Sequence, residues 1–263
     1  MHLKLPPFFL ILLSCLFLQG HSHAEPAVRA SLPKPGIVLT FDDSINIELW
    51  VKQIPLFEKY GAKVTFFIEK PDQLNAAQTK GLQQLKKAGH EIGCHGYRHI
   101  KALDAIENQG GDHYLKIEID PAVAKLESLG FPPASFAYPM SNNNQNSDAL
   151  IRKYFHHART GTRPGHGKTL AESDEFFTPI NTTAKKFCLP ARSLDRSTEE
   201  RLQKEIFPAL ERIKTRDEVI VFYDHAIISE TSRKNHIRPE ILELILVKVK
   251  EMDLAFYRMD DLP

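Results

Sequence analysis

Cysteine and tryptophan are scarce in this 263-residue chain, which has 3 Cys and 1 Trp. Three cysteines exclude a scaffold built on several disulfides, and the absence of a CxxC pair speaks against a cysteine-based metal site. An excess of charge is also lacking, because 34 Lys and Arg face 33 Asp and Glu. Since no sustained basic run is present either, we expect no nucleic-acid partner and no general attraction for anionic lipid.

The chain has one long apolar run, at its N-terminus. Lys4 precedes the apolar residues 6–18, and the small-residue triplet 22–24 (SHA) follows. This order is typical of a secretory signal peptide cleaved after Ala24, so we expect a secreted, periplasmic or cell-surface protein. The run is short for a bilayer, which needs about 20 residues. We therefore expect no stable membrane span after cleavage, with an uncleaved anchor or lipidation at Cys15 as the alternatives.

Removal of residues 1–24 would leave a chain without net charge. Lys4 is the only charged residue in that segment, so 33 basic and 33 acidic residues would remain. A neutral or mixed-charge polymer suits such a chain better than a strongly charged one. Cys94 and Cys188 would also remain, and they allow either one disulfide or two free thiols.

From about residue 36 onward, short β-rich runs alternate with helical patterns, and no Gly/Ser-rich stretch separates them. Strands are predicted at residues 37–41, 63–68, 91–94, 135–138, near 157, 186–189, 219–223 and 255–259. Helices are predicted at residues 47–60, 73–88, 117–129, 147–155, 198–214 and 239–252. Residues 161–181 are expected to form a loop.

The order of these elements predicts an α/β fold with a parallel sheet. Seven or eight β/α units in about 230 residues favour a barrel over a small open sheet. We expect one domain over residues 36–263, preceded by the signal peptide at 1–24 and a linker at 25–35. No heptad or long exposed apolar stripe is present, so the protein is expected to be a monomer.

Three polar clusters directly follow predicted strands. Residues 40–43 (TFDD) place Asp42 and Asp43 after the first strand, and residues 94–99 (CHGYRH) place two histidines after the third. A late strand, residues 219–223, is followed by Asp224 and His225. Because the carboxyl ends of parallel strands meet at one edge of a sheet, these side chains are expected to share a cleft.

The clusters together suggest a metal site. One carboxylate and two neutral imidazoles are a recurrent three-ligand set of catalytic zinc sites, and His95 and His99 converge on one ion if their segment turns like a helix. Each cluster alone has an ordinary explanation. Asp43 is a good residue to cap the next helix, a pair of histidines arises by chance in a chain with 12 of them, and a strand-end histidine such as His225 is more often structural than catalytic.

The ordered set TFDD, HGYRH, a proline-bearing segment at residues 136–141 (FAYPMS) and a near-terminal strand ending in His225 resembles the polysaccharide deacetylases. This family is also called carbohydrate esterase family 4 or the NodB homology domain. The resemblance extends from about Ile37 to the final strand, and it implies a distorted (β/α) barrel of about seven strands. It further implies a general base at Asp42, metal ligands at Asp43, His95 and His99, and a general acid at His225.

The resemblance also implies a reaction and a cofactor. The reaction is hydrolysis of N-acetyl groups on an acetylated polysaccharide or oligosaccharide that contains N-acetylglucosamine. A divalent metal is implied, with Zn²⁺ as the default and Co²⁺, Ni²⁺ or Mn²⁺ as alternatives. Tyr138, Pro139 and Asn142 are expected to contact the substrate, and a backbone N–H near Tyr138 to stabilise an oxyanion. The alternatives are an O-acetyl esterase acting on xylan-type polymers and a non-catalytic glycan-binding member of the fold.

The proline-bearing segment departs from the family pattern at two positions. Ala137 stands where many members have an arginine that pairs with the catalytic base, and Ser141 replaces a glycine. Arg159 or Arg163, which follow the strand near residue 157, are candidates to approach Asp42 from a neighbouring strand end.

The family's fourth motif, an Asp and a Trp that support the acid histidine, has no recognisable counterpart. Trp50 is the single tryptophan and lies in the first predicted helix. Arg192 and Asp195 occupy roughly the region of this motif, and they are candidates for the supporting role.

Overall fold

A computed structural model describes residues 31–229 and 234–263 of the chain, together with His2. Apart from His2, the predicted signal peptide lies outside the described residues, and so does most of the predicted linker. Lys4 and Cys15 are therefore not described either. The export prediction therefore stays a prediction.

Seven parallel strands close into a barrel, because β8 pairs with both β7 and β1. Around the barrel they run β1 (Gly36–Asp42), β2 (Thr65–Ile68), β3 (Glu91–Cys94), β4 (Ser135–Ala137), β5 (His157–Thr162), β7 (Cys188–Ser193) and β8 (Glu218–Asp224). The predicted (β/α) barrel of about seven parallel strands is confirmed.

Four further strands lie outside the ring. β11 (Ala255–Tyr257) pairs with the beginning of β1, and β9 (Ala226–Ile227) pairs with β10 (His236–Ile237). The strand β6 (Phe177–Pro179) runs antiparallel to β8. The prediction of a plain loop over residues 161–181 is therefore wrong. A three-residue strand is too short to show alternation, and tertiary pairing with β8 decides its conformation.

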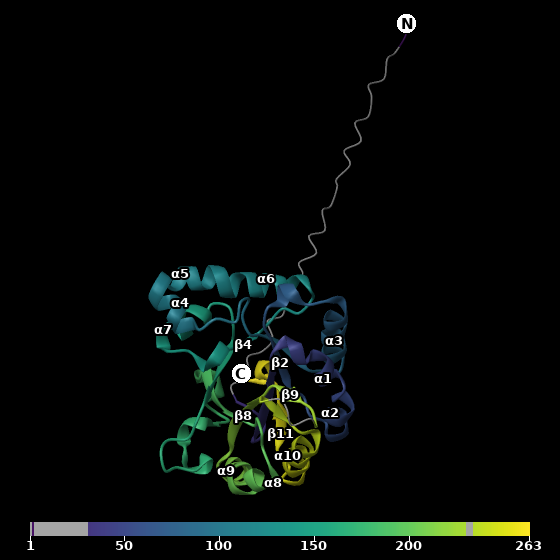
Figure 1. Cartoon of the computed structure of the whole chain (residues 1–263), viewed down its shortest axis with the longest axis vertical. Coiled ribbons are helices and arrows are strands. Elements are labelled where there is room, and N and C mark those ends of the chain that lie inside the picture. The colour runs from purple at the N-terminus through teal and green to yellow at the C-terminus, as the bar shows by residue number, and fades with distance from the viewer. Residues whose placement is uncertain (1, 3–30, 230–233) are drawn as a thin grey trace.

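Helices surround the strands, with α4 to α7 gathered at one end of the view and α8 to α10 at the other (Figure 1). Their bounds are α1 (Ile47–Val51), α2 (Ile54–Tyr60), α3 (Ala76–Lys87), α4 (Ala102–Gln109), α5 (Gly111–Tyr114), α6 (Asp120–Ser128), α7 (Gln145–Ile151), α8 (Glu199–Arg201), α9 (Phe207–Arg216) and α10 (Pro239–Glu251). Two π-helical turns, Leu115–Ile119 and Leu202–Ile206, join neighbouring helices.

Two predicted helices are interrupted. The helix expected at residues 47–60 is split into α1 and α2, with Pro55 in the first turn of α2. The helix expected at 198–214 consists of α8, a π-helical turn and α9, with Pro208 at the beginning of α9. Proline has no N–H for the helical ladder, so a new helix begins where it stands. The helices α4 and α5 were not predicted.

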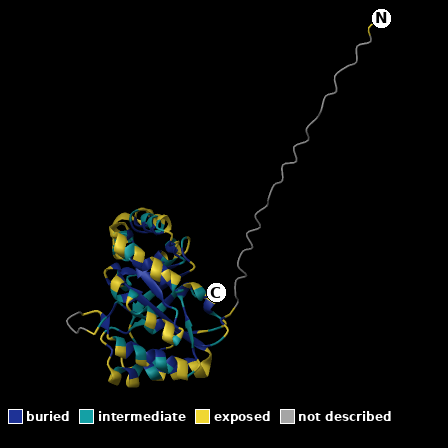
Figure 2. Cartoon of the chain, turned by 90° about the vertical axis from the view of Figure 1, so that its right-hand side faces the viewer, coloured by how far each residue is buried: buried dark blue, intermediate teal, exposed yellow. Residues whose placement is uncertain are grey.

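The first barrel strand shows how the core positions the site. Along β1, Ile37, Leu39 and Phe41 belong to the apolar layer between strands and helices. Val38 belongs to a second apolar cluster. Because strand side chains alternate between two faces, Thr40 and Asp42 share the face of Val38, in the interior of the barrel. Buried residues accordingly follow the strands, whereas exposed residues follow the outer faces of the helices (Figure 2).

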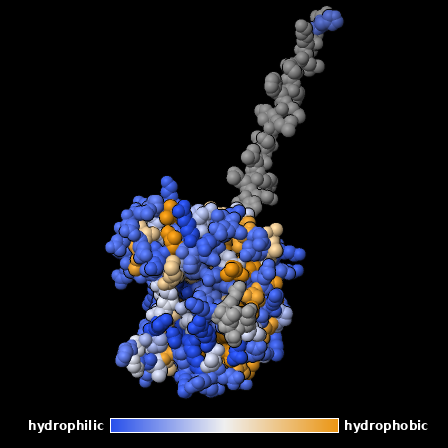
Figure 3. Space-filling model, in the orientation of Figure 1, coloured by the Kyte–Doolittle hydropathy of each residue, from blue (hydrophilic) through white to orange (hydrophobic). Residues whose placement is uncertain are grey.

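The surface in the view of Figure 3 is mostly hydrophilic, with small separate apolar spots. None of the helices in the described part of the chain combines the length and the apolar character that a bilayer crossing requires. Cys94 and Cys188 are free thiols on β3 and β7, so the disulfide alternative is not realised in the structure.

Candidate active site

Asp42 ends β1 and is 3% exposed. An amino group of the Arg159 guanidinium donates a hydrogen bond to Asp42 Oδ2, while the buried Oδ1 has no hydrogen-bond partner. Burial alone would raise the pKa of Asp42, but the positive charge of Arg159 holds it below its ordinary value. Asp42 is therefore an ionised carboxylate with one oxygen still available to accept a proton.

Arg159 contacts Asp42 from β5, the strand next to β4. The family arginine would have been at Ala137, on β4. The Cα of Arg159 pairs with that of Ala137 across β4 and β5, so both side chains point to the barrel interior. The guanidinium is 1% exposed, and its carbon lies 4.6 Å from the ring centroid of Tyr223. The small Ala137 side chain leaves room for this arrangement. Of the two arginines considered from the sequence, Arg159 contacts Asp42.

Asp43, His95 and His99 converge at the same end of the barrel. One ligand atom from each of the three lies within 4.8 Å of the other two. His95 Nε2 and His99 Nε2 are 3.2 Å apart, and Asp43 Oδ1 lies 3.7 Å and 3.8 Å from them. Two nitrogens bound tetrahedrally to one Zn²⁺ at 2.0–2.1 Å are about 3.3 Å apart. The three residues therefore fit one divalent metal.

The backbone and burial of Asp43 agree with a ligand role better than with a helix cap. Asp43 precedes a short 3₁₀ turn, but its side chain makes no capping hydrogen bond. Its φ of 76° is unusual for a residue other than glycine. Burial and the charge of Asp42 raise the pKa of Asp43 to about 6, and its buried Oδ1 has no hydrogen-bond partner. A cation would compensate this uncompensated carboxylate.

A hydrogen bond fixes the tautomer of His95. Its Nδ1 lies 2.7 Å from the carbonyl oxygen of Ala137, which can only accept. The hydrogen is therefore on Nδ1, and Nε2 of the neutral ring presents a lone pair toward His99 and Asp43. Burial lowers the pKa of His95 to about 3, so the ring is neutral at physiological pH.

The segment that carries both histidines is a bent loop, so the two rings converge without the helix-like turn that their spacing would suit. Gly96 and His99 have φ values of 89° and 61°. A Cβ on Gly96 would lie 2.0 Å from Glu118 Oε1, so only glycine fits beside this carboxylate. Glu118 accepts hydrogen bonds from the N–H groups of Arg98 at 2.7 Å and Ile100 at 3.2 Å. The buried Glu118, in a π-helical turn, thus holds the histidine loop in place.

His225 directly follows β8, the strand that pairs with β1. Its Nδ1 lies 3.0 Å from Asp195 Oδ1, and its Nε2 lies 4.0 Å from Asp43 Oδ2. Burial would lower the pKa of His225, but the hydrogen bond to Asp195 and the nearby carboxylates raise it to about 9. His225 is therefore a cation at neutral pH with Nε2–H directed at the cleft. The structure brings Asp195 to the supporting position suggested by the sequence.

The single tryptophan also supports His225, although it lies far from the family's fourth motif in sequence. The indole N–H of the fully buried Trp50 donates to the carbonyl oxygen of His225 at 2.7 Å. The buried Asp224 accepts from the His225 backbone N–H at 2.7 Å. The main chain of His225 is thus held from α1 and from its own strand.

A cleft of about 380 Å³ is lined by Asp42, Arg159, the three candidate metal ligands, Asp195 and His225. Its walls also include Tyr138, Met140, Ser141, Tyr223 and Asn235. Met140 is 52% exposed, and together with Tyr223 it adds apolar surface to this lining.

The expected substrate contacts are only partly supported. Tyr138 lines the cleft, but its hydroxyl donates to Asp148 at 2.8 Å and its N–H to the Arg159 carbonyl at 3.1 Å. That N–H is therefore already engaged and is not the oxyanion donor that we expected near this residue. The Tyr138 side chain belongs to the layer between strands and helices, because it alternates with Ala137.

Pro139 and Asn142 do not line the cleft. Pro139 is buried, and Asn142 Oδ1 accepts a hydrogen bond from the N–H of Leu103 at 2.7 Å. Asn142 thereby fixes the beginning of α4. The cleft lining therefore gives no support to the prediction that these two residues contact substrate, whereas Met140 and Ser141 between them do line the cleft.

Arg163 and Arg192 lie outside the cleft. Arg192 Nε forms an ion pair with Glu205, and both arginines line a neighbouring cavity. Neither contacts Asp42 or His225. The side chain of Arg192 points away because Ala191 and Ser193 take the alternate face of β7.

Several residues of the site were not found from the sequence. Glu69 follows β2, and its Oε2 lies 3.9 Å from His99 Nδ1. A signal existed for Glu69, since it is an acid at the end of a buried strand. No local signal marks Glu118 or Trp50, whose roles depend on tertiary packing.

A family model described as polysaccharide deacetylase matches residues 29–167, more than half of the chain. The uncharacterized protein YlxY of Bacillus subtilis (strain 168) is 32% identical over 116 residues, which cover 44% of this chain and 34% of the relative. The chain therefore spans about a third of the length of this curated relative.

Solved structures show the same fold. One is the Xyl-CE4 domain of a multidomain xylanase from the hindgut metagenome of Trinervitermes trinervoides, with a TM-score of 0.54 and 17% identity over 87% of this chain and 89% of that chain. Another is a family 4 acetyl xylan esterase from Clostridium thermocellum in complex with a cobalt ion, with a TM-score of 0.54 and 18% identity over 86% of this chain and 88% of that chain. A CE4-family pseudoenzyme from Bacillus anthracis has a TM-score of 0.53 at 15% identity, over 88% of this chain and 66% of its own.

The family match and the barrel agree with each other. The match covers β1 to β5, which carry Asp42, Asp43, His95, His99 and Arg159. The solved structures extend the likeness to the remaining strands. This chain belongs to the polysaccharide deacetylase family.

Proposed function

We propose that this protein is a divalent-metal-dependent hydrolase that removes N-acetyl groups from a polysaccharide containing N-acetylglucosamine. The observation that carries the proposal is that three kinds of group line one cleft. They are a buried ionised carboxylate, Asp42, the three-residue ligand set, and a cationic histidine, His225. Metal-assisted amide hydrolysis needs a base, an electrophile and an acid within reach of the same carbonyl group.

The ligand set consists of Asp43, His95 and His99, and we propose Zn²⁺ as the metal, with Co²⁺, Ni²⁺ or Mn²⁺ able to occupy the same residues. When bound, the metal supplies a Lewis acid that polarises the acetyl carbonyl and lowers the pKa of water. The chain itself keeps His95 neutral and its Nε2 free of a proton, through the contact of Nδ1 with the Ala137 carbonyl.

Asp42 is the proposed general base. As water attacks the acetyl carbon, one water proton passes to Asp42 Oδ1, the oxygen without a hydrogen-bond partner. Arg159 holds the other oxygen and keeps the carboxylate ionised before the transfer. Arg159 is thus a positioning residue in the place of the arginine that the family has at Ala137.

His225 is the proposed general acid. Its Nε2 proton passes to the sugar nitrogen as the carbon–nitrogen bond breaks, which releases acetate and the free amine. Asp195 orients the ring and stabilises its protonated form. An amine leaves only when it is protonated, whereas an ester alkoxide depends less on an acid. Because hydrogen bonds hold His225 in place and keep it protonated, the site favours N-acetyl over O-acetyl substrates.

The proposal is tested by measuring acetate released from N-acetylglucosamine oligomers by the purified protein, before and after chelation and after addition of Zn²⁺ or Co²⁺. Release that chelation abolishes and metal restores is the expected result. No release with a folded, metal-loaded protein would contradict it, and an assay on O-acetylated xylan would then separate an esterase from a non-catalytic member of the fold. Export, predicted from residues 1–24, would bring the enzyme to extracellular polymers of this kind.

A further inference from the structure

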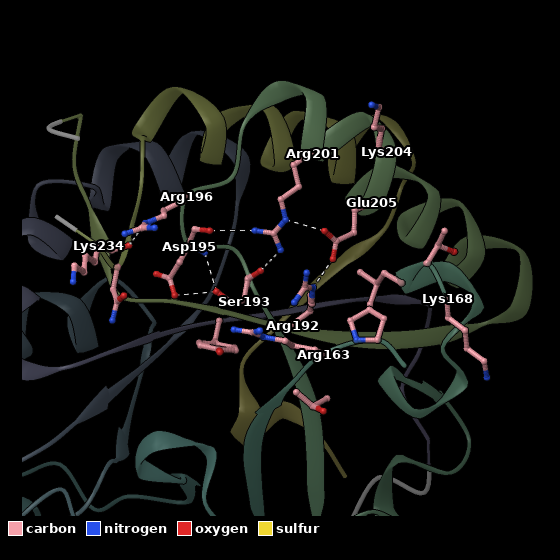
Figure 4. Close-up of a pocket in the computed structure, with 16 residues that line it drawn as sticks. Arg163, Lys168, Arg192, Ser193, Asp195, Arg196, Arg201, Lys204, Glu205 and Lys234 are labelled. Carbon is pink, nitrogen blue, oxygen red and sulfur yellow. Dashed lines mark hydrogen bonds and ion pairs between the residues drawn. The ribbon is translucent and has the colours of Figure 1, made fainter. Parts of the chain in front are cut away.

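A second and larger cavity adjoins the active-site cleft. Its volume is about 810 Å³, and Figure 4 draws the residues that line it. Asp195, Tyr223 and Asn235 line both this cavity and the cleft. A polymer whose acetylated unit occupied the cleft would reach this cavity past Asp195, the partner of His225. Its volume is that of a site for a small organic ligand, which corresponds to one or two sugar units.

The lining of this cavity is strongly basic. Seven of its side chains are basic and two, Asp195 and Glu205, are acidic. The whole chain carries a formal net charge of only +1, so the excess is local to this surface. The basic residues are Arg163, Lys168, Arg192, Arg196, Arg201, Lys204 and Lys234.

Part of this charge is fixed in place. Arg192 and Arg201 both form ion pairs with Glu205, so two guanidinium groups share one carboxylate. Arg201 also donates to the carbonyl oxygen of Asp195 at 3.2 Å and to Ser197 Oγ at 3.0 Å. Asp195, the other acid, is engaged with His225. The wall therefore keeps a net positive charge on pre-oriented side chains.

Two further basic side chains, Arg163 and Lys168, face this wall, and the charge of Lys168 also acts on Glu172. Thr162 pairs with Arg192 across β5 and β7, so Arg163 follows directly beside the wall. The side chains of Arg163 and Lys168 form no hydrogen bond or salt bridge within residues 31–229 and 234–263, and both residues are exposed. Arg163 and Arg192 lie in the middle of the cavity, whereas Lys168 and Lys204 lie at its edge (Figure 4).

The opposite side of the cleft has no such charge. There the surface next to His99 and Met140 includes Lys101 and Asp104, which pair with each other at 3.7 Å. The positive potential is therefore confined to the His225 side. Arginine groups of this kind match the planar oxygens of carboxylates, because the guanidinium presents a rigid fork of donors.

We propose that this basic cavity binds a carboxylate on the sugar unit next to the one that is deacetylated, so that the substrate is an acidic polymer in which N-acetylated amino sugars adjoin uronic acids. This inference rests on the proposed function for the identity of the neighbouring unit. The charge balance of the chain favours a neutral or mixed-charge polymer. Of these two, the basic cavity favours a mixed-charge polymer whose acidic unit lies on one side of the unit that reacts.

Calorimetric binding to the purified protein tests the proposal with three hexasaccharides. One is neutral N-acetylglucosamine, one alternates N-acetylglucosamine with glucuronate, and one is 6-O-sulfated N-acetylglucosamine. At low salt we expect the glucuronate probe to bind about tenfold more tightly than the neutral one, and the difference to shrink as salt screens the charges. Equal affinity of the acidic and neutral probes would overturn the proposal, and a preference for the sulfated probe would overturn its assignment to a carboxylate.

Two variants and a matched control locate the effect. Arg163→Gln and Lys168→Gln are each expected to weaken binding of the glucuronate probe about three- to fivefold, since each removes one charge from the cavity. Lys80→Gln removes an equally exposed lysine on α3, outside the cavity, and should leave binding unchanged. If all three variants bind like the wild-type protein, the acidic group binds elsewhere and the proposal is wrong.

The same probes separate this inference from the proposed function. If the glucuronate probe binds preferentially but no probe loses acetate, the deacetylase proposal fails and the acidic-glycan site stands. If the neutral and glucuronate probes bind equally and both lose acetate, the deacetylase proposal stands and the acidic-glycan site fails.

Discussion

Both ends of the barrel bury carboxylates, but the two ends differ in whether the carboxylate oxygens have hydrogen-bond partners. At the carboxyl ends of the strands, Asp42 Oδ1 and Asp43 Oδ1 are buried without a hydrogen-bond partner. At the amino ends, Glu91 accepts hydrogen bonds from Thr65 Oγ1 at 2.7 Å, Ser135 Oγ at 2.5 Å and the Asp260 N–H at 2.9 Å. Both oxygens of Glu91 are therefore satisfied.

The difference separates a functional end from a structural one. A buried polar atom without a partner costs free energy, so its persistence points to a ligand or to chemistry. A satisfied buried carboxylate instead ties elements together, and Glu91 joins β2, β3 and β4 to the C-terminal segment. In the described part of the chain, Asp43, His95 and His99 form the metal-type cluster, and it lies at the carboxyl end. This agrees with the general division of labour in β/α barrels.

The largest effect is expected from Asp42→Asn. Asparagine keeps the shape and an acceptor for Arg159 but cannot take a proton from water, so kcat should fall about 10²- to 10⁴-fold. Acetate release measured alongside bound metal checks this, because metal binding should be retained. A variant that retained the wild-type rate would show that the unpartnered oxygen is not the base.

At the other end, Glu91→Ala should destabilise the protein without removing metal. The substitution leaves three buried donors without an acceptor, which costs about 2–4 kcal/mol of unfolding free energy. Urea unfolding gives this number, and bound metal is measured on the same sample. Loss of metal from the folded variant would contradict the separation of the two ends.

A smaller effect is expected from Glu118→Gln, which weakens the support of the histidine loop. An amide has one acceptor oxygen for the N–H groups of Arg98 and Ile100, so metal affinity should fall about tenfold. Glu127→Gln, at an exposed position on α6, is the matched control. Competition with a chromophoric chelator measures both, and an equal affinity of the two variants would show that Glu118 does not position the ligands.

A further prediction concerns the pH dependence of stability at the structural end. Burial and the neighbouring Asp260 raise the pKa of Glu91 to about 7 from its ordinary value of 4.5. Between these values the unfolded chain has released the proton that the folded chain retains, so the contribution of Glu91 to stability falls as pH rises, by at most about 1.4 kcal/mol per pH unit.

This contribution is isolated by subtracting the unfolding free energy of Glu91→Gln from that of the wild-type protein. The difference should decline from about pH 4.5 to about pH 7 and then level off, because the amide does not titrate. A difference that is constant over this range would show that the folded and unfolded states bind the Glu91 proton equally.

Much of the barrel could be predicted from the sequence, because its strands are continuous apolar runs between helical patterns. The strand predicted at residues 91–94 coincides with β3, and the strand predicted at 37–41 lies within β1. Elements decided by tertiary contacts were missed. The short β6 exists through its pairing with β8, and α4 begins where Asn142 accepts the N–H of Leu103.

The site was predictable where its residues end strands. Asp42, Asp43, His95 and His225 all follow this rule, and their convergence required only the parallel order of the strands. The replacement of the family arginine by Arg159 depended on the register between β4 and β5, which sequence does not reveal. Packing also decides that Trp50 contacts the His225 carbonyl and that Arg163 and Arg192 line the second cavity.

A single metal site formed by Asp43, His95 and His99 is central to the proposed function. It is tested by elemental analysis of the Zn²⁺ that stays bound after dialysis, in the wild-type protein and in His99→Ala. We expect one ion per chain for the wild-type protein and almost none for the folded variant. A wild-type protein that binds no ion, or a variant that binds as much as the wild type, would contradict it.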